Sequence, residues 1–505
     1  MSAATEKAWQ NVGKRHHHGI QVPLLSLRTE KSCGNGEFLD LLPLIDWLSS
    51  IGMDVLQLLP LNDSALDPSP YNAISSTALH PIYLSLHALP YATDLDPFRI
   101  YNETKRVAYR EVLELKLAYL KTYIAKHQDT IQANPEYLAF IQKSPHLIDY
   151  ALYKSLQEKH HGKAWIKWPR ADQLKQHPLD EEAIFHLMVQ FLCHEQLKTV
   201  KARAEKKGIL LKGDIPILIS PDSADVWAHQ EFFDLSKTAG SPPNPFDPPG
   251  QNWKFPLYNW KAMEENHFEW WRKRIEIATN YFHLYRVDHI LGFFRIWAIP
   301  HGKTPSEGHF IPQDLGLMKA QGEKLLSTLA SFSEMLPIGE DIGDPPPFVR
   351  TSMNDLGIPG TKIFRYCRNW KTDHSFIPFE DYPPCSIASV STHDLEPLPL
   401  WWRNHPDAAE DFAHFKGWTY QKQLSLKHHE EILRDIHHCG SLFHVNLLQE
   451  YLALMPELTW DNPQDEQINI PGTESDFNWT YRYKLPLETL TRHTALKKQL
   501  RHLID

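Results

Sequence analysis

The sequence has few cysteines, and none of them are spaced for a disulfide framework or a zinc site. Five occur among 505 residues, and no two form a CxxC pair. They are Cys33, Cys193, Cys367, Cys385 and Cys439. An odd, widely scattered set of this kind is typical of free thiols in a reducing compartment.

Long apolar runs and long basic runs are also missing. No uninterrupted apolar stretch is long enough to cross a bilayer, and the amino terminus lacks the basic-then-apolar pattern of a secretion signal. The formal net charge of −10 argues against a polyanionic partner such as nucleic acid or an acidic membrane. We therefore expect a cytoplasmic protein that binds neither.

The short motifs that announce a cofactor are absent. There is no GxxxxGK loop for a phosphate, no lysine motif for a Schiff base and no His/Glu pair at metal-ligand spacing on a predicted helix. The sequence thus predicts no cofactor and no metal. The run His16-His17-His18 resembles a metal site or part of a purification tag, but we interpret it as the segment leading into the first strand.

The chain is about twice as long as a bare (β/α)8 barrel of ~250 residues. It must therefore hold several domains or one barrel with large insertions. We find no internal repeat, low-complexity tract or flexible linker, which favours a single decorated domain over residues 1–505.

Several short apolar segments end in charged residues. Residues 281–297 (YFHLYRVDHILGFFRIW) begin as a buried strand and continue into Arg286, Asp288 and His289. The same pattern brings Asp214 in 208–219, Glu340 in 335–343, and His393 with Asp394 in 385–394. Unpartnered charges are costly inside a core, so these residues need an ion-pair network or a role at a pocket.

The spacing of these segments predicts the fold class. Consecutive acids Asp214, Asp288, Glu340 and Asp394 lie 52 to 74 residues apart, which is room for a strand, a helix and some decoration. Further strands are predicted at 20–27, 54–61, 358–370 and 387–394. Acids at the ends of successive strands favour an α/β fold, a (β/α)8 TIM barrel with large, mostly helical insertions between strands. Each acid alone could be an ion pair at the barrel rim; four together indicate a site.

The motifs RVDH, GEDIG, STHD and KGDIPI resemble those of the amylomaltases, the 4-α-glucanotransferases of the α-amylase superfamily. Residues 250–260 (GQNWKFPLYNW), followed by YRVDHILGFFRIW, are similar in particular to the plant cytosolic disproportionating enzyme and its bacterial relatives. The resemblance extends from Gly19 to Trp479 and so covers nearly the whole chain. It implies maltooligosaccharide and α-glucan substrates.

A retaining glycosidic exchange needs one carboxylate as nucleophile and one carboxylic acid as proton donor. Arg286 lies two positions before Asp288 on the same strand face, so we expect it to lower the pKa of Asp288 and keep this nucleophile ionised. Glu340, beside Asp341 and after an apolar run, is the predicted acid/base residue. The resemblance supports both roles and adds Asp394 as the third acid, which binds the hydroxyls of the distorted sugar.

The remaining site residues follow mainly from the resemblance. Tyr71 lies in a polar, Pro-rich loop after the second strand, where a solvated turn is the alternative. The other expected substrate-binding residues are Asp214, Arg286, His289, His393, Phe246, Trp253 and Asn469. Asp214 is expected to support Arg286, and the two histidines to hydrogen-bond the sugar.

Two insertions are predicted between barrel strands. Residues 94–206 contain long amphipathic helices, and Trp165 and Trp168 in a loop there are either core residues or sugar-stacking platforms. Residues 236–262 are rich in proline and aromatics and match the lid loop of the family. Phe246 keeps only one of the two adjacent aromatics usual at the lid tip.

Two functional readings compete with glucan transfer. An α-1,4-glucan hydrolase would use the same residues with water as acceptor, because the difference is how well the site excludes water. The Pro-rich lid favours transfer. The second competing reading is an inactive glycan-binding protein, and the presence of all three acids with Arg286 speaks against it.

Overall fold

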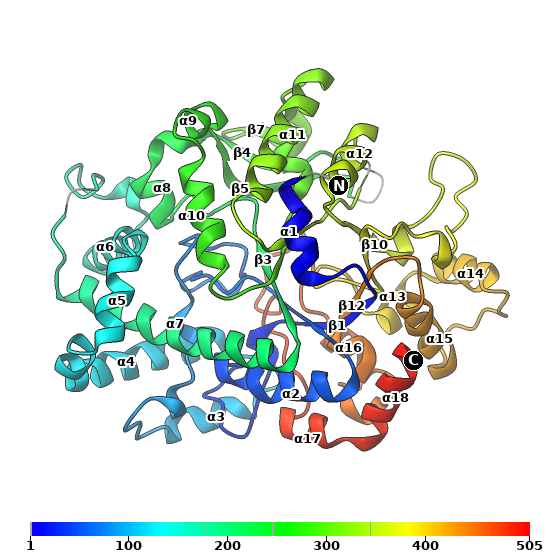
Figure 1. Ribbon diagram of the computed structural model, residues 1–505, viewed down its shortest axis with the longest axis horizontal. Helices are drawn as coiled ribbons and strands as arrows, with labels where there is room; N and C mark the ends of the chain where they lie inside the picture. The colour runs from blue at the N-terminus through cyan, green and yellow to red at the C-terminus, as the bar shows by residue number, and fades with distance from the viewer. Residues whose placement is uncertain (1–2, 176, 245–246, 344) are drawn as a thin grey trace.

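Eight parallel strands form the centre of the protein (Figure 1). The computed structural model describes residues 3–175, 177–244, 247–343 and 345–505. In chain order the strands are β1 (His17–Val22), β2 (Val55–Leu58), β3 (Leu210–Ile215), β6 (Leu284–Val287), β9 (Leu336–Gly339), β10 (Gly360–Ile363), β11 (Ser386–Ser389) and β12 (Phe443–Leu447).

The strand pairing closes these eight strands into a barrel. Neighbours in the sheet are neighbours in this chain order, and β12 pairs with β1 in parallel register. Between β9 and β10, the Gly339 amide donates to the Pro359 carbonyl at 2.8 Å. The predicted (β/α)8 TIM barrel is confirmed.

Most residues of the barrel strands are buried, and β10 is the most accessible of the eight. Every residue of β2, β9, β11 and β12 is buried, as expected for a parallel sheet covered by helices. Of the eight, β12 was not predicted, because His444 and Asn446 interrupt its apolar pattern. The residues of β12 nevertheless alternate between apolar and polar (FHVNL), which is the period of a strand, and the register with β1 places it in the barrel.

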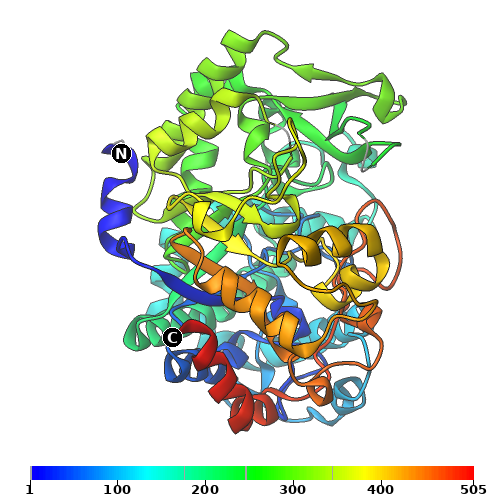
Figure 2. The ribbon, with the colours of Figure 1, turned by 90° about the vertical axis from the view of Figure 1, so that its right-hand side faces the viewer.

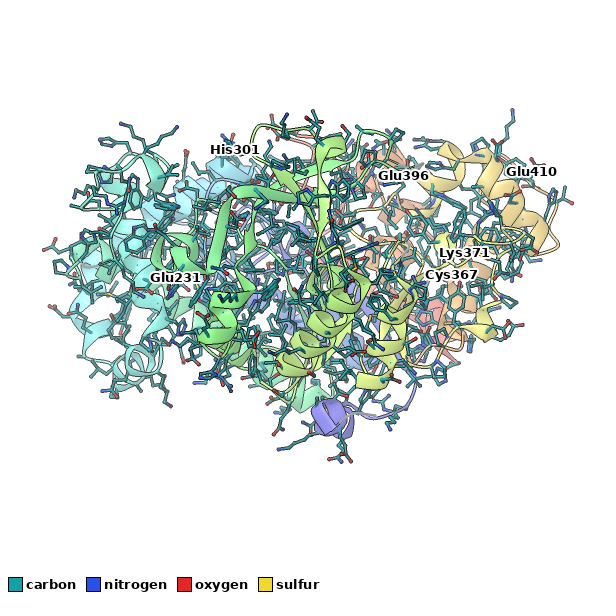
Figure 3. The ribbon with its side chains drawn as sticks, turned by 90° about the horizontal axis from the view of Figure 1, so that it is seen from above. Glu231, His301, Cys367, Lys371, Glu396 and Glu410 are labelled. Carbon is teal, nitrogen blue, oxygen red and sulfur yellow. The ribbon has the colours of Figure 1, made fainter. Side chains whose placement is uncertain are left out.

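Helices cover the outside of the barrel. They include α2 (Leu41–Ile51), α7 (Glu181–Lys207), α10 (Glu269–Ala278), α11 (Leu315–Ala330) and α12 (Pro347–Leu356), each between two successive barrel strands. The connection from β10 to β11 differs, since it holds only the short turns η10 (Phe364–Tyr366) and η11 (Phe379–Asp381). Figure 3 labels Cys367 and Lys371 in this connection.

The last barrel unit is helical on both sides of β12. The helices α13 (Leu398–Asn404), α14 (Pro406–Phe415) and α15 (Leu426–His437) precede that strand. The chain then ends with α16 (Leu448–Leu452), α17 (Leu487–Arg492) and α18 (Thr494–Ile504). In Figure 2 both chain ends lie on the left, where α1 (Ala3–Val12) leads into β1.

The segment predicted as a helical insertion, 94–206, carries α3 (Arg99–Asn102), α4 (Tyr109–Gln132), α5 (Pro135–Lys143), α6 (His146–Lys159) and most of α7. α7 has favourable ends: the Asp180 carboxylate caps the Ala183 amide, and Gly208 ends the helix in the left-handed region at φ 69°. Trp165 and Trp168 are 4% and 3% exposed, which places both in the core and not on a sugar-facing surface.

The predicted lid, 236–262, is not a loop over most of its length. It belongs to a hairpin of β4 (Phe233–Ser241) and β5 (Gln251–Tyr258), which joins β7 (Ile296–Pro300) and β8 (His309–Ile311) in a four-stranded antiparallel sheet. Register shifts in the β4–β5 pair remove the regular alternation that would have revealed the strands. Seen from above (Figure 3), this green sheet lies between the cyan helical segment and the yellow to orange helices α13–α15.

Two further features concern the compartment. All five cysteines are free, and only Cys385 is not fully buried. Among the described residues, no helix combines the length and apolar character needed to span a membrane.

A buried ion pair joins the helical segment to the barrel. Lys116 of α4 lies 2.6 Å from the Glu37 carboxylate, and both side chains are 0% exposed. The ammonium also donates to the carbonyls of Ile82 and Leu84. Two charges that share several hydrogen bonds away from water depend strongly on each other.

We expect Lys116→Met to lower the free energy of unfolding by about 3–5 kcal/mol, because Glu37 would stay buried without its counter-charge. Urea unfolding measures this loss. Lys121→Met is the matched control on the same helix: its partner Glu158 is half exposed, so the cost should stay below about 1 kcal/mol. Equal effects of the two variants would contradict the importance of the buried pair.

Candidate active site

The candidate acids come from four strands of the barrel. Asp214 lies in β3, Asp288 directly follows β6, Glu340 directly follows β9, and Asp394 lies beyond β11. The pairing aligns Asp214 with Arg286, and Val287 with Gly339. Because parallel strands all end at the same mouth of the barrel, the register brings these side chains together.

Arg286 connects three of the four carboxylates. Its Nη1 lies 3.0 Å from both oxygens of Asp214 and 2.9 Å from Oδ1 of Asp288. Its Nη2 lies 3.6 Å from Oε2 of Glu340. Burial lowers the pKa of the guanidinium, but the surrounding carboxylates outweigh it and raise the pKa well above its ordinary value. Arg286 is therefore a permanent cation.

The carboxylates differ in their access to solvent. Asp214 is 0% exposed at its side chain, whereas Glu340, Asp288 and Asp394 are 15%, 22% and 42% exposed. The three predicted catalytic acids thus reach an open surface, and Asp214 lies beneath them as an anchor for Arg286.

Glu340 is in an environment that retains a proton. Burial and the charge of Asp288 raise its pKa to about 7, against the opposing effect of Arg286. The amides of Ile342 and His289 donate to its two oxygens at 3.0 Å and fix its orientation. The carboxylate predicted to perturb it, Asp341, instead turns to Arg350 at 2.8 Å and to the Thr361 amide at 2.7 Å.

The pKa of Asp288 differs from the expectation. Arg286 favours its ionised form as predicted, but burial is the larger effect, and Asp214 and Asp394 act in the same direction as burial. The net result is a pKa raised above the ordinary value of Asp. Sequence spacing shows the arginine but not the burial or the two other carboxylates.

Asp394 has the opposite electrostatic environment. Asn469 donates to its Oδ1 at 2.7 Å, and Nε2 of His393 lies 3.1 Å from its Oδ2. Burial raises its pKa, but His393, Asn469 and Arg286 outweigh this and bring the pKa down to about 2. Asp394 is therefore ionised at neutral pH.

An aromatic group borders these acids. The hydroxyl of Tyr71 donates to Asp214 at 2.8 Å and lies 2.9 Å from Nε2 of His393, whose ring stacks on it. Trp479 packs against both rings, at centroid distances of 5.5 and 5.8 Å, and Gln21 approaches Nδ1 of His393 at 3.2 Å. Tyr71 is thus part of the site and not of a solvated turn.

Sequence reasoning did not assign a role to Gln21 or Trp479. Gln21 lies between the apolar residues Ile20 and Val22 of β1 and is 4% exposed, so the signal was an amide at a core position. Trp479 has φ 65°, a left-handed conformation unusual for a large side chain. Nothing in the sequence indicates that backbone angle.

The hairpin reaches the site through Trp253. Its ring makes an edge contact with His289 at 5.0 Å, and its Nε1 donates to Gln251 at 2.9 Å. His289 has φ 39°, and burial, Arg286 and Arg295 lower its pKa to about 4, so it is neutral. Phe246, the other predicted lid residue, lies outside the described residues.

Comparison with known proteins gives the family. A family model described as 4-alpha-glucanotransferase matches residues 22–488. The chain belongs to the 4-alpha-glucanotransferase family. The enzyme therefore acts on α-glucans, and the resemblance read from its motifs is confirmed.

Individual relatives agree with this assignment. A 4-alpha-glucanotransferase from Chlamydia pneumoniae is 42% identical over 501 residues, covering 96% of this chain and 95% of the relative. The rice 4-alpha-glucanotransferase DPE2 is 34% identical over 359 residues, covering 66% of this chain and 37% of the plant protein. The structure of amylomaltase from Streptococcus agalactiae in complex with acarbose has a TM-score of 0.82 and 25% identity, covering 97% of this chain and 98% of the other.

We expect Asp214→Asn to lower the free energy of unfolding by about 3 kcal/mol, because the variant removes the buried charge that anchors Arg286. Turnover should fall as well, since Arg286 also orients Asp288 and Glu340. Urea unfolding and glucan disproportionation measure the two effects. Tyr71→Phe removes only the neighbouring hydroxyl, so its stability cost should stay below about 1.5 kcal/mol. A normal unfolding midpoint together with normal turnover in Asp214→Asn would contradict the anchoring role.

Proposed function

We propose that this 4-alpha-glucanotransferase works by a retaining double displacement, with Asp288 as nucleophile and Glu340 as acid/base. The observation that carries the proposal is the position of Arg286 between the two carboxylates. Its guanidinium lies 2.9 Å from Asp288 but 3.6 Å from Glu340. A single cation stabilises the nearer negative charge more, so the ionised form belongs to Asp288 and the proton to Glu340.

In the first half of the reaction, an Asp288 oxygen attacks the anomeric carbon of an α-1,4-linked glucose unit. Glu340 gives its proton to the glycosidic oxygen as that bond breaks, so the leaving glucan departs with a 4-hydroxyl. The product is a covalent ester between the glycosyl unit and Asp288. The two amides that donate to Glu340 then stabilise its new negative charge.

In the second half, Glu340 accepts the proton of an acceptor's 4-hydroxyl, and the resulting oxygen attacks the anomeric carbon. The bond to Asp288 breaks, and Asp288 and Glu340 return to their starting states. Asp394 would hydrogen-bond the hydroxyls of the distorted ring, and its low pKa keeps it an acceptor as positive charge develops on the sugar. His393, Asn469 and Tyr71 hold Asp394 and Asp214 in place.

The same residues bear on the two competing functions, glycan binding without catalysis and glucan hydrolysis. An inactive glycan-binding protein would have no need for carboxyl groups with pKa values of about 7 and about 2 at one mouth. Hydrolysis by the same acids is a side reaction whose extent depends on water access. The net charge of −10 and the free thiols support a cytoplasmic enzyme without a nucleic-acid partner.

Glu340→Gln should lose nearly all activity on maltooligosaccharides but still react with an α-glucosyl fluoride, whose leaving group needs no proton. Wild-type kcat/KM should fall about tenfold per pH unit above pH ~7, because the active form has Glu340 protonated and the pKa of Glu340 is about 7. It should also fall at acid pH, where Asp288 becomes protonated and can no longer attack.

Asp288→Asn is the companion variant, and it should fail on both substrates because an amide cannot attack the anomeric carbon. Release of fluoride and formation of the glycosyl-enzyme, detected by intact mass, are the measurements. Equal losses on the two substrates in Glu340→Gln would point to a structural role for that residue.

We propose that Trp253, in strand β5 of the hairpin, limits the access of water to the active site. Trp253→Ala should increase glucose release by hydrolysis relative to transfer, because the indole covers His289 next to the nucleophile. The measurement is the ratio of new reducing ends to redistributed oligosaccharides from maltotriose. Leu235→Ala, at an exposed position of β4 in the same sheet, is the control that should leave the ratio unchanged. An unchanged ratio in Trp253→Ala would exclude this residue from water exclusion.

A further inference from the structure

Three histidines meet near the amino ends of the barrel strands, away from the acids. His18 is the second residue of β1, His444 is the second residue of β12, and the two are aligned in the pairing register. His437 is the last residue of α15. One ring nitrogen from each lies within 4.8 Å of the others. Figure 2 shows β1 in blue running beside the orange segment that carries β12.

The rings are held in mutual contact. The Nδ1 atoms of His18 and His437 are 2.9 Å apart, and the His18 ring stacks on His444 at 4.9 Å. His16, at the surface, also stacks on His444 at 5.2 Å. The run of three histidines in the sequence therefore has two members beside this cluster, while His17 turns to Asp54 at 2.8 Å.

The buried imidazole of His444 lacks a well-formed hydrogen bond within the described chain. Its side chain is 0% exposed, and within the described chain neither ring nitrogen makes a hydrogen bond of good geometry. The backbone of Cys439 and Ser441 approaches the ring but does not satisfy it. Buried polar side chains normally have partners, so an unpartnered imidazole facing two others suggests a missing ligand.

All three rings are neutral. Burial lowers the pKa of His18 to about 4 and that of His444 to about 3, and it takes the pKa of His437 well below its ordinary value. The charged or titratable groups facing them are Asp54, His16, His17 and His438, and only Asp54 favours protonation. A neutral imidazole keeps the lone pair that a metal ion requires.

Contacts at both ring nitrogens hold the His437 side chain in place. The Tyr451 hydroxyl accepts from the Asn446 amide at 2.9 Å and donates to the Gly19 carbonyl at 3.3 Å. Nε2 of His437 lies 2.8 Å from the same hydroxyl, and its Nδ1 is directed at His18. Metal-ligating histidines are typically fixed in this way by a bond at the other nitrogen.

We propose that His18, His437 and His444 bind a divalent transition-metal ion of the zinc type. Three imidazoles suit zinc, with a water as fourth ligand. Nitrogens at Zn–N distances of 2.0–2.1 Å around a tetrahedral ion are ~3.3 Å apart. The ligand atoms lie within 4.8 Å of one another, so they need to approach by at most about 1.5 Å through ring rotation. The proposal departs from the sequence-based expectation of no metal.

The position of the cluster indicates a stabilising and not a catalytic ion. Its ligands come from the first barrel strand, the last barrel strand and the helix between β11 and β12. An ion would therefore hold the first and last strands of the barrel together. The active-site acids lie at the carboxyl ends of their strands, on the other face. A second group, Glu158, Glu182 and His186, is less suited because Lys121 already lies 2.6 and 3.3 Å from its two carboxylates.

The test is zinc binding by the full-length protein after treatment with a chelator. When Zn²⁺ is added back and the excess is removed by desalting, the wild type should retain about one Zn²⁺ per chain. Excess Zn²⁺ should raise the Tm of the metal-free protein by about 3 °C. His18→Gln and His444→Asn should each lower the zinc affinity by more than the roughly 10–100-fold typical of losing an outer partner. His18 is only partly buried, so His18→Gln keeps the test valid if His444→Asn folds poorly.

His438→Gln is the matched control, because His438 is exposed and adjacent in sequence but outside the cluster. It should bind zinc as the wild type does. The proposal is overturned if the wild type retains no zinc and shows no Tm change, in which case the histidines are a packing cluster only. It is equally overturned if the cluster variants retain as much zinc as the control.

Discussion

The position of Arg286 is the constraint on which the active site depends. One guanidinium, 12% exposed, contacts a fully buried carboxylate and two partly exposed ones. Asp214 neutralises it from below, so its orientation does not depend on substrate. The two upper carboxylates then compete for one cation at unequal distances, which separates their protonation states without a metal or a mobile group. The position of Arg286 follows from the strand register, because Asp214 and Arg286 are paired residues of β3 and β6.

The barrel explains why residues so distant in sequence can be placed this accurately. Each acid lies in or after a mostly buried strand of four to six residues, whose direction is fixed by its parallel neighbours. The elements that differ from a minimal barrel, the helices in 94–206 and the sheet of β4, β5, β7 and β8, lie outside this register. The hairpin of β4 and β5 reaches the mouth, where Trp253 contacts His289, while the acids stay at the ends of the barrel strands.

The sequence was most informative where a charge interrupts an apolar strand. That pattern predicted the barrel and located Asp214, Arg286, Asp288, Glu340 and Asp394, since a buried charge has few explanations besides a site. The sequence was less informative about properties that depend on the folded structure, namely burial, neighbouring charges and strand register. Burial raises the pKa of Asp288, Asp288 and not Asp341 acts on Glu340, and the register shifts of the hairpin concealed two strands. β12 was missed for the opposite reason, because its polar residues point to partners that only the fold supplies.

The two ends of the barrel solve the problem of buried polar groups differently. At the carboxyl end, each of the four acids has a hydrogen-bond or ionic partner: Asp214, Asp288, Glu340 and Asp394. Their burial and mutual charges shift the pKa values of Glu340 and Asp394 in opposite directions, which suits acid–base chemistry. At the amino end, the buried polar groups are neutral imidazoles, and the ring nitrogens of His444 lack a well-formed hydrogen bond among the described residues. Charge cannot satisfy that group, since burial keeps it neutral, whereas a ligand that accepts its lone pair can. His18 and His444 are aligned residues on the first and last barrel strands, just as Asp214 and Arg286 are aligned on β3 and β6. In both places the strand register brings the two side chains together.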